Sequence, residues 1–336
     1  MMIRHDWTVD EALALFELPF MDLCQQAQGV HRAHHPANRV QLCTLSNIKS
    51  GGCPEDCAYC PQSARYATGT EAEALLPVET VLEQAQIAQQ NGASRFCMGA
   101  AWRKVRDNKD FDKTLDMVRQ VSALGLEVCA TFGMITDHQA QRLEEAGLTA
   151  YNHNIDTSPE YYERVISTRL FEQRLETLEA VRKAGLRVCS GGIVGMGETL
   201  RDRAGMLVTL ANLQAHPESV PINSLVAIEG TPLEEQEPVD SFEFLRMIGV
   251  ARLMMPASRI RLAAGRQSLS REGQALAFLC GANSIFYGDR LLITDNPDVA
   301  ADRALFETLG IEPLQARPRS RKALTDGDVK APEATL

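Results

Sequence analysis

Residues 110–133 read DFDKTLDMVRQVSALGLEVCATFG, and this stretch carries the local signals that decide the fold. Residues 110–124 place apolar side chains at helical spacing. Gly125 follows, as expected for a residue that ends a helix in a left-handed conformation. The run LEVCATFG at 126–133 is short and apolar, which is typical of a buried strand. The stretch therefore predicts a helix, a glycine turn and a strand.

This unit recurs along the chain. Glycine ends a helical run in QQNGAS, SALGLE, EEAGLT and RKAGLR, at Gly92, Gly125, Gly147 and Gly185. Strand-like runs are expected at 40–48, 94–101, 126–133, 148–155, 186–195, 219–228, 258–265 and 282–293. Helical runs are expected at 78–91, 110–124, 136–146, 171–184, 199–214, 240–255, 270–280 and 301–309. Eight strand–helix units over about 250 residues predict an α/β fold, a TIM-type (β/α)8 barrel. An open doubly wound sheet is the alternative, because periodicity does not show closure.

The two ends differ from this pattern. Residues 1–38 read as an N-terminal helical extension, interrupted at Pro19 and ended by Pro36. The barrel is expected at 39–312. Residues 313–336 are polar, contain prolines and lack an apolar period, so they predict a disordered tail.

Composition and charge argue against several classes of function. The formal net charge of −10 argues against non-specific binding to nucleic acid or an anionic membrane. No apolar run approaches the roughly 20 residues that span a bilayer, and the first residues lack a secretion signal. A cytoplasmic location is therefore expected. The nine cysteines are odd in number, which favours metal binding or catalysis over disulfides.

The most informative motif is GGCPEDCAYCP at 51–61, with Cys53, Cys57 and Cys60 on a loop after the first strand. Thiolates are the soft ligands of zinc and of iron–sulfur clusters. Three local cysteines can ligate three irons of a 4Fe–4S cube and leave the fourth iron open to a small molecule. A zinc knuckle would need a distant fourth ligand, and an electron-carrying ferredoxin centre would show a fourth local cysteine.

Three further cysteines share one position near the ends of their strands. Cys97, Cys129 and Cys189 follow Arg95, Glu127 and Arg187 by two residues each. Because strand side chains alternate and buried charges need partners, both sets are expected inside the barrel, with Phe96, Val128 and Val188 facing the helices. Together with Arg261 they predict a second site. A buried free cysteine can also be a small hydrophobe; Cys24 and Cys280 are interpreted so, and Cys43 is left open.

The segment YNHNID at 151–156 ends the fourth strand, where barrel active sites lie. Asparagine amides both donate and accept, and a carboxylate suits ribose hydroxyls. Simple turn chemistry is the alternative reading of such a segment. His153 alternates away from the asparagines and is interpreted as structural.

The cysteine loop, with Tyr59 just before its third thiol, resembles that of the radical S-adenosylmethionine (SAM) superfamily. The run GGIVGMGE at 191–198 matches the superfamily pattern G-x-I-x-G-x-x-E. The resemblance implies a 4Fe–4S cluster on Cys53, Cys57 and Cys60, and SAM bound to its open iron. It also implies SAM contacts from Tyr59, Asn154, Asp156 and Ile193.

A narrower resemblance is to the sulfur-inserting members of this superfamily. It rests on CPEDCAYCPQS (53–63), RFCMGAAW (95–102), YNHNIDTSPE (151–160), CSGGIVGMGET (189–199), ESVPIN (218–223) and GANSIFYG (281–288). It implies a 2Fe–2S cluster on Cys97, Cys129, Cys189 and Arg261. It further implies dethiobiotin near Asn152, Asn154 and Asn223, with no catalytic side chain beyond the cofactor ligands.

The same resemblance implies a homodimer and an electron donor such as flavodoxin or ferredoxin. Two alternatives stay open at this point. One is a radical SAM enzyme on the same barrel that inserts no sulfur, and the other is a cluster carrier or scaffold without catalysis.

Overall fold

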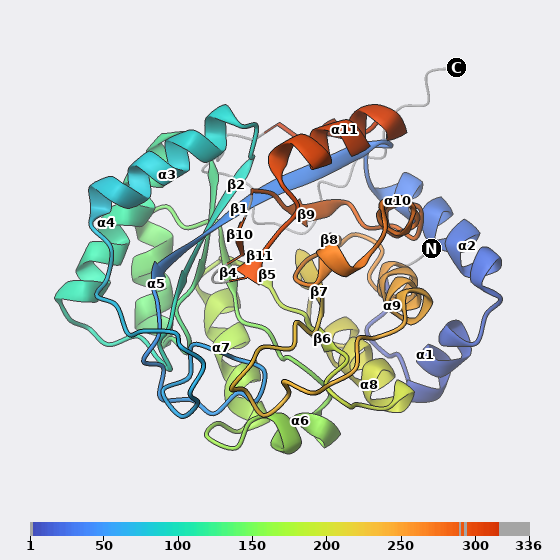
Figure 1. Cartoon of the computed structure of the whole chain (residues 1–336), viewed down its shortest axis with the longest axis horizontal. Coiled ribbons are helices and arrows are strands. Elements are labelled where there is room, and N and C mark those ends of the chain that lie inside the picture. The colour runs from blue at the N-terminus through green and yellow to red at the C-terminus, as the bar shows by residue number, and fades with distance from the viewer. Residues whose placement is uncertain (1–2, 289, 292–293, 316–336) are drawn as a thin grey trace.

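The computed structural model describes residues 3–288, 290–291 and 294–315, and within them eight parallel strands form a closed barrel ringed by helices (Figure 1). Neighbouring strands pair in parallel, and β9 pairs back onto β1 with Gln41 opposite Ser284. The barrel strands are β1 (Arg39–Lys49), β2 (Arg95–Ala100), β3 (Glu127–Thr131), β4 (Ala150–Asn152), β5 (Arg187–Cys189), β7 (Ser219–Ser224), β8 (Arg259–Leu262) and β9 (Ser284–Phe286). The closing pair confirms the predicted barrel and excludes the open sheet.

The helices fall where the apolar period placed them. They are α3 (Val78–Gln90), α4 (Lys109–Ala123), α5 (Asp137–Glu145), α7 (Phe171–Lys183), α8 (Leu200–Ala211), α9 (Ser241–Met254), α10 (Arg271–Leu279) and α11 (Val299–Leu309). A further helix, α6 (Pro159–Val165), was not expected. Its 7 residues are too few to show a period, although Ser158 caps it and Pro159 occupies its first turn.

The predicted strand at 186–195 is wrong in one respect, because the structure divides it into β5 and β6 (Gly192–Val194). β6 pairs with β7. A Cβ atom on Gly191 would lie 1.9 Å from the carbonyl oxygen of Pro221. The close passage of these two backbones requires glycine and bends the chain between the two short strands.

The remaining elements are small. The strands β10 (Arg290–Leu291) and β11 (Thr294–Asp295) form an antiparallel hairpin, and Arg266–Ser268 form a 3-10 turn. The strand β12 (Glu312–Pro313) pairs with the start of β1. The predicted tail therefore begins within a strand, and from residue 316 onward it lies outside the described residues. The boundaries of the extension, barrel and tail stay predictions.

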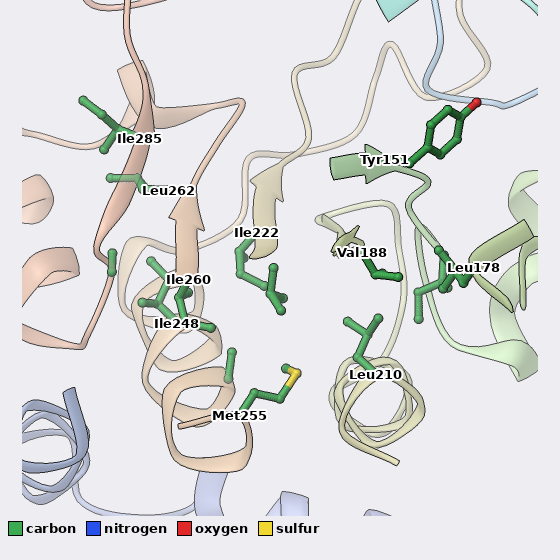
Figure 2. Close-up of a cluster of buried hydrophobic side chains, with 14 of the residues drawn as sticks. Tyr151, Leu178, Val188, Leu210, Ile222, Ile248, Met255, Ile260, Leu262 and Ile285 are labelled. Atoms are coloured by element: carbon green, nitrogen blue, oxygen red, sulfur yellow. The ribbon is translucent and has the colours of Figure 1, made fainter. Parts of the chain in front are cut away.

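Most of the core lies between the barrel and its helices. Phe96, Val128 and Val188 belong to this layer, as predicted. Figure 2 shows part of it, where strand side chains face helix side chains: Tyr151, Leu178, Val188, Leu210, Ile222, Ile248, Met255, Ile260, Leu262 and Ile285. A separate, smaller buried cluster contains cysteines from β1, β2, β3 and β5. The apolar layer thus leaves the barrel interior to thiols and charges.

The predicted N-terminal extension consists of α1 (Val9–Phe16) and α2 (Phe20–His34). These helices pack against α8 and α9 on the outside of the barrel (Figure 1). Leu23 of α2 is fully buried and packs closely against Gly249 of α9. A Cβ atom added to Gly249 would lie 3.0 Å from the Cγ atom of Leu23. Across the described part of the chain, no helix combines the length and apolar character needed to cross a membrane.

Candidate active site

All three cysteines of the first predicted set and two of the second line one cavity of about 340 Å³ at the carboxyl ends of the barrel strands. Cys53, Cys57 and Cys60 line it from the loop after β1. Cys97 and Cys129 line it from inside the barrel. Arg261 of β8 and Tyr59 complete this part of the wall. The fold therefore brings both sets of thiols to a common interior space.

Two acids, the buried Glu55 and the partly exposed Asp56, hold the cysteine loop in place. Asp56 accepts hydrogen bonds from the backbone N–H groups of Ser167 and Thr168, at 3.0 and 3.1 Å. Burial opposes the ionisation of Asp56, but these bonds outweigh it and lower its pKa to about 2. Glu55 forms ion pairs with Arg103 at 2.8 Å and Arg169 at 3.3 Å. The segment after α6 thus anchors the loop that carries the three thiols.

The thiols of this loop suit a positively charged cluster. Burial raises the pKa of Cys53 and Cys57, and raises the pKa of Cys60 to about 11. The protein by itself therefore keeps them protonated, and the charge of a bound iron reverses that preference. In the described residues no three ligand-type side chains surround one mononuclear ion position. A four-iron cube instead takes one thiolate per iron, which suits a loop of three spaced cysteines.

The second set of thiols forms a compact group with a cation beside it. Cys97, Cys129 and Cys189 cluster with Cys43, and all four are buried. Arg261 lies 3.6 Å from the Cys189 sulfur through Nη1, and its Nε donates to Ser284 Oγ at 3.0 Å. The Arg261 Nη2 atom is buried without a hydrogen-bond partner. A buried guanidinium nitrogen without a partner, on a residue that already contacts one of the thiols, fits the position expected for Arg261 in the second ligand set.

Electrostatics favour a thiolate in this group. Hydrogen bonds from Cys189 and Cys97 lower the pKa of Cys129, against the effect of burial. The charges of Arg95 and Arg261 act in the same direction. The thiolate form is the one that ligates iron. This part of the barrel is therefore prepared for an electropositive centre.

On the amino-terminal side of the second thiol group, the charged residues that precede these cysteines by two positions pair with one another. Glu127 forms ion pairs with Arg95 at 2.9 Å and Arg187 at 3.3 Å, and it lies 3.7 Å from Arg259. Burial raises the pKa of Glu127, but the three cations overcome it and bring the value to about 2. Of these four charged residues, Arg187 is the exposed one. The group therefore closes the amino-terminal end of the barrel.

The polar residues of the fourth strand converge on the same cavity. Asn152 donates to Asn154 Oδ1 at 3.0 Å and to the Cys189 sulfur at 3.3 Å. Asn154 Oδ1 also accepts from the backbone N–H of Gly191 at 3.2 Å. Asn223 of β7 donates through its amide nitrogen to the Gly192 carbonyl oxygen, and its amide oxygen accepts from the backbone N–H of Ala264. The amide of Asn152 thus links β4 to β5, and the amide of Asn223 links β7 to β6 and to the residue that follows β8 by two positions.

Asp156 and Ile193 meet through the backbone. The Ile193 N–H donates to the Asp156 carbonyl oxygen at 2.8 Å, and both side chains line the cavity. The Asp156 carboxylate is buried and forms an ion pair with Arg174 of α7. Arg174 also donates to the Asn154 carbonyl oxygen and to the Tyr162 hydroxyl, each at 2.9 Å. Arg174 is therefore a cavity residue that sequence reasoning missed.

The GGIVGMGE run is explained by backbone contacts. Glu198 accepts from the backbone N–H groups of Gly195 at 2.9 Å and Met196 at 2.7 Å. It also pairs with Arg203 at 2.6 Å. The glutamate thus fixes the turn that follows β6 and that presents Ile193 to the cavity.

The structure also locates Cys43 and His153. Cys43, for which the sequence allows either a site role or a core role, lies with the second thiol group. Its strand β1 pairs with β2, which places Cys43 opposite Arg95. His153 is buried in the cavity wall, with its Nε2 atom 3.4 Å from Arg169 Nη1; the structural role expected for it stays a prediction. Burial lowers the pKa of His153 and keeps it neutral. A cysteine at an interior position of β1 was the signal that could have placed Cys43.

Comparisons with known proteins agree with this arrangement. Residues 47–210 match the model of the Radical SAM superfamily, and residues 221–312 match the Biotin and Thiamin Synthesis associated domain. The solved structure of methylornithine synthase superposes with a TM-score of 0.77 at 20% identity, covering 92% of this chain and 94% of that chain. The structure of the FeFe-hydrogenase maturase HydG from Carboxydothermus hydrogenoformans superposes with a TM-score of 0.75 at 17% identity, covering 91% of this chain and 76% of that chain. At such identities these structures show the barrel fold alone.

Curated relatives are far more similar. The biotin synthase of Aeromonas hydrophila is 61% identical over 93% of this chain and 86% of its own length. The biotin synthase of Myxococcus xanthus is 58% identical over 94% of this chain and 91% of its own length. The biotin synthase of Synechococcus sp. CC9902 is 57% identical over 99% of this chain and 98% of its own length. With this similarity along nearly its whole length, and with both sets of thiols in one barrel, the chain belongs to the biotin synthase family of the radical SAM superfamily.

Proposed function

We propose that this chain inserts sulfur into dethiobiotin to form biotin, with SAM as the radical source. The observation that carries the proposal is the single cavity lined by Cys53, Cys57 and Cys60 on one side and by Cys97 and Cys129 on the other. Substrate held between the two sets would lie near both a radical source and a sulfur source.

The chain's residues divide into two ligand sets. Cys53, Cys57 and Cys60 would hold a 4Fe–4S cluster, and Cys97, Cys129, Cys189 and Arg261 would hold a 2Fe–2S cluster. When bound, the first cluster supplies the electron that cleaves SAM to a 5′-deoxyadenosyl radical, and the second supplies the sulfur. The protein holds these groups in line and excludes water.

Binding and orientation fall to the polar wall. Tyr59, Asn154, Asp156 and Ile193 would contact SAM, with Asp156 suited to ribose hydroxyls. Arg174 engages Asp156 through Oδ2, so the pair can hold the carboxylate in a fixed position in the buried site. Asn152, Asn154 and Asn223 would lie near the ureido ring of dethiobiotin, whose N–H and C=O groups match amide donors and acceptors.

The family relationship supports three further proposals. The enzyme acts as a homodimer in the cytoplasm, and it receives electrons from a small donor such as flavodoxin or ferredoxin. Size-exclusion chromatography with light scattering tests the first of these directly.

The test of the function uses anaerobically reconstituted full-length protein, with iron and sulfide counted, dethiobiotin as substrate and dithionite as reductant. Cys53→Ala is expected to lower 5′-deoxyadenosine to background. Cys129→Ala is expected to retain the 4Fe–4S absorption and SAM cleavage but to form no biotin. Cys24→Ala removes a thiol from α2, outside both sets, and is expected to retain both products.

The outcomes separate the alternatives. Unchanged 5′-deoxyadenosine from Cys53→Ala would refute the first ligand set. Normal biotin from Cys129→Ala would favour a different sulfur source. A wild-type protein that binds iron and sulfide yet never cleaves SAM would be a cluster carrier.

A further inference from the structure

A second hollow lies on the outer side of the loop that carries Cys53. We call it the basic cleft; its volume is about 530 Å³. Its lining residues include five cations and one carboxylate: Lys49, Arg65, Arg103, Lys104, Arg106 and Asp110. Such a concentration of positive charge stands out on a chain whose net charge is −10.

Most of these cations are not neutralised. Arg103 pairs with Glu55. Lys49 Nζ donates to the Gly51 carbonyl oxygen at 2.8 Å, and Arg65 Nε donates to the Pro54 carbonyl oxygen at 3.0 Å. Within the described residues, neither of these two side chains forms an ion pair, and the same holds for Lys104 and Arg106. The cleft therefore presents to solvent several positively charged side chains that have no ion-pair partner among the described residues.

The position of the cleft relates it to the first ligand set. Gly52 and Pro54, which flank Cys53, form part of its lining. Ala101 and Trp102 line both the basic cleft and the inner cavity. The two hollows are therefore separated by little more than the Cys53 loop and this short segment after β2. An electron source resting in the cleft would be close to a cluster on Cys53, Cys57 and Cys60.

The distribution of charge favours a large partner. Arg65, Lys104 and Arg106 are exposed, and the five cations come from segments 49–65 and 103–106. They are spread around an open hollow and do not converge on one buried point. A spread, exposed positive surface matches an acidic protein face, where charge complementarity steers association and orients the complex.

We propose that the basic cleft is the docking surface for the acidic face of a small electron-transfer protein, which delivers an electron to the cluster held by Cys53, Cys57 and Cys60. This inference rests on the proposed function. One electron passes from the reduced partner to the cluster, so the partner is oxidised and the cluster reduced by one unit. No bond is formed between the two proteins.

The test follows reduction of the 4Fe–4S cluster in reconstituted holoenzyme by stopped-flow absorbance, with fully reduced flavodoxin as the probe. Lys104→Glu/Arg106→Glu changes the cleft charge by four units and is expected to lower the second-order rate constant at least about tenfold at low salt. The wild-type rate should fall steeply between about 50 and 200 mM salt, and the variant rate should depend on salt much less.

The matched control is Arg32→Glu/Lys183→Glu, which makes the same charge change in the last turns of α2 and α7. It is expected to keep the wild-type rate. Iron content and circular dichroism confirm folding of both variants. Equal rates for the cleft variant and the wild type at low salt would overturn the docking surface. The proposal also fails if inorganic phosphate binds the wild type and not the cleft variant while the flavodoxin rate is unchanged, because the cleft is then a small-anion site.

Dithionite separates this inference from the proposed function. With dithionite as reductant, the cleft variant is expected to produce 5′-deoxyadenosine at the wild-type rate, because a small reductant needs no docking face. Loss of SAM cleavage in the wild-type enzyme under dithionite would contradict the proposed function itself. Loss in the cleft variant alone would show a role in the chemistry and overturn docking as its role.

Discussion

Asp156 shows how much a single buried charge depends on its neighbour. Its backbone adopts a left-handed conformation, with φ at 69°, and its carboxylate is buried. Arg174 supplies the opposite charge and also bonds the Asn154 carbonyl oxygen. A buried carboxylate that loses its partner is left uncompensated in a region of low polarity. The pair therefore fixes the segment that faces the cavity.

We expect Arg174→Met to lower the free energy of unfolding by about 3–5 kcal/mol, because it leaves a buried carboxyl group without its ion-pair partner. Urea denaturation of the cluster-free protein at neutral pH measures this. The double variant Arg174→Met/Asp156→Asn removes both charges and should recover part of the loss. A double variant less stable than Arg174→Met would mean that the ion pair is not the source of the effect.

At the scale of elements, the start of α8 supports the GGIVGMGE turn. Thr199 caps the helix by accepting from the Asp202 N–H, and Asp202 in return accepts from the Thr199 N–H at 2.8 Å. Ser158, just before α6, donates to Asp202 at 3.1 Å. The cap thus joins two helix starts on the cavity side of the barrel.

Thr199→Ala should reduce stability by about 1 kcal/mol, the usual effect of losing an N-cap side chain. Thr199→Ser keeps the hydroxyl and is the matched control, which should retain most of the stability. Thermal or chemical unfolding of the two variants measures the difference. Equal losses in both would assign the effect to the methyl group and not to the cap.

The same cap predicts a pH dependence. Burial opposes ionisation of Asp202, but hydrogen bonds from Thr199 lower its pKa below the ordinary value. Because the folded-state pKa is depressed, its stabilising contribution is fully present above the unfolded value of about 3.9. That contribution is lost as pH falls through the lower folded-state pKa. Asp202→Asn should therefore differ from the wild type most at neutral pH and least in acid, measured by urea midpoints.

At the scale of the whole molecule, α1 and α2 cover helices of the barrel's outer layer (Figure 1). Leu23 is fully buried on this interface, whereas Met21 on the same helix is 71% exposed. The extension therefore contributes apolar burial to the barrel.

Leu23→Ala is expected to destabilise the protein by about 2–5 kcal/mol, since it removes a buried side chain and leaves a cavity. Met21→Ala on the same helix should change stability by no more than about 0.5 kcal/mol. Denaturant unfolding of the two variants provides the comparison. Similar small effects would mean that the extension unfolds independently of the barrel.

Sequence alone determined the features that neighbouring residues control. Helical and strand periods predicted the eight repeating units, because side-chain spacing along a few turns decides which face can be buried. The spacing of Cys53, Cys57 and Cys60 placed three thiols on one loop. The recurrence of charged residues two positions before Cys97, Cys129 and Cys189 correctly predicted an interior with paired charges.

Tertiary structure decided what depends on distant parts of the chain. Closure of the barrel required β9 to reach β1, and the same strand register brought Cys43 into the second thiol group. The Asp156–Arg174 and Glu55–Arg169 pairs join segments whose separation gives no sequence period. The basic cleft likewise gathers two segments onto one surface. Local patterns fix which residues are buried, but only the path and register of the whole chain fix which buried or charged groups meet.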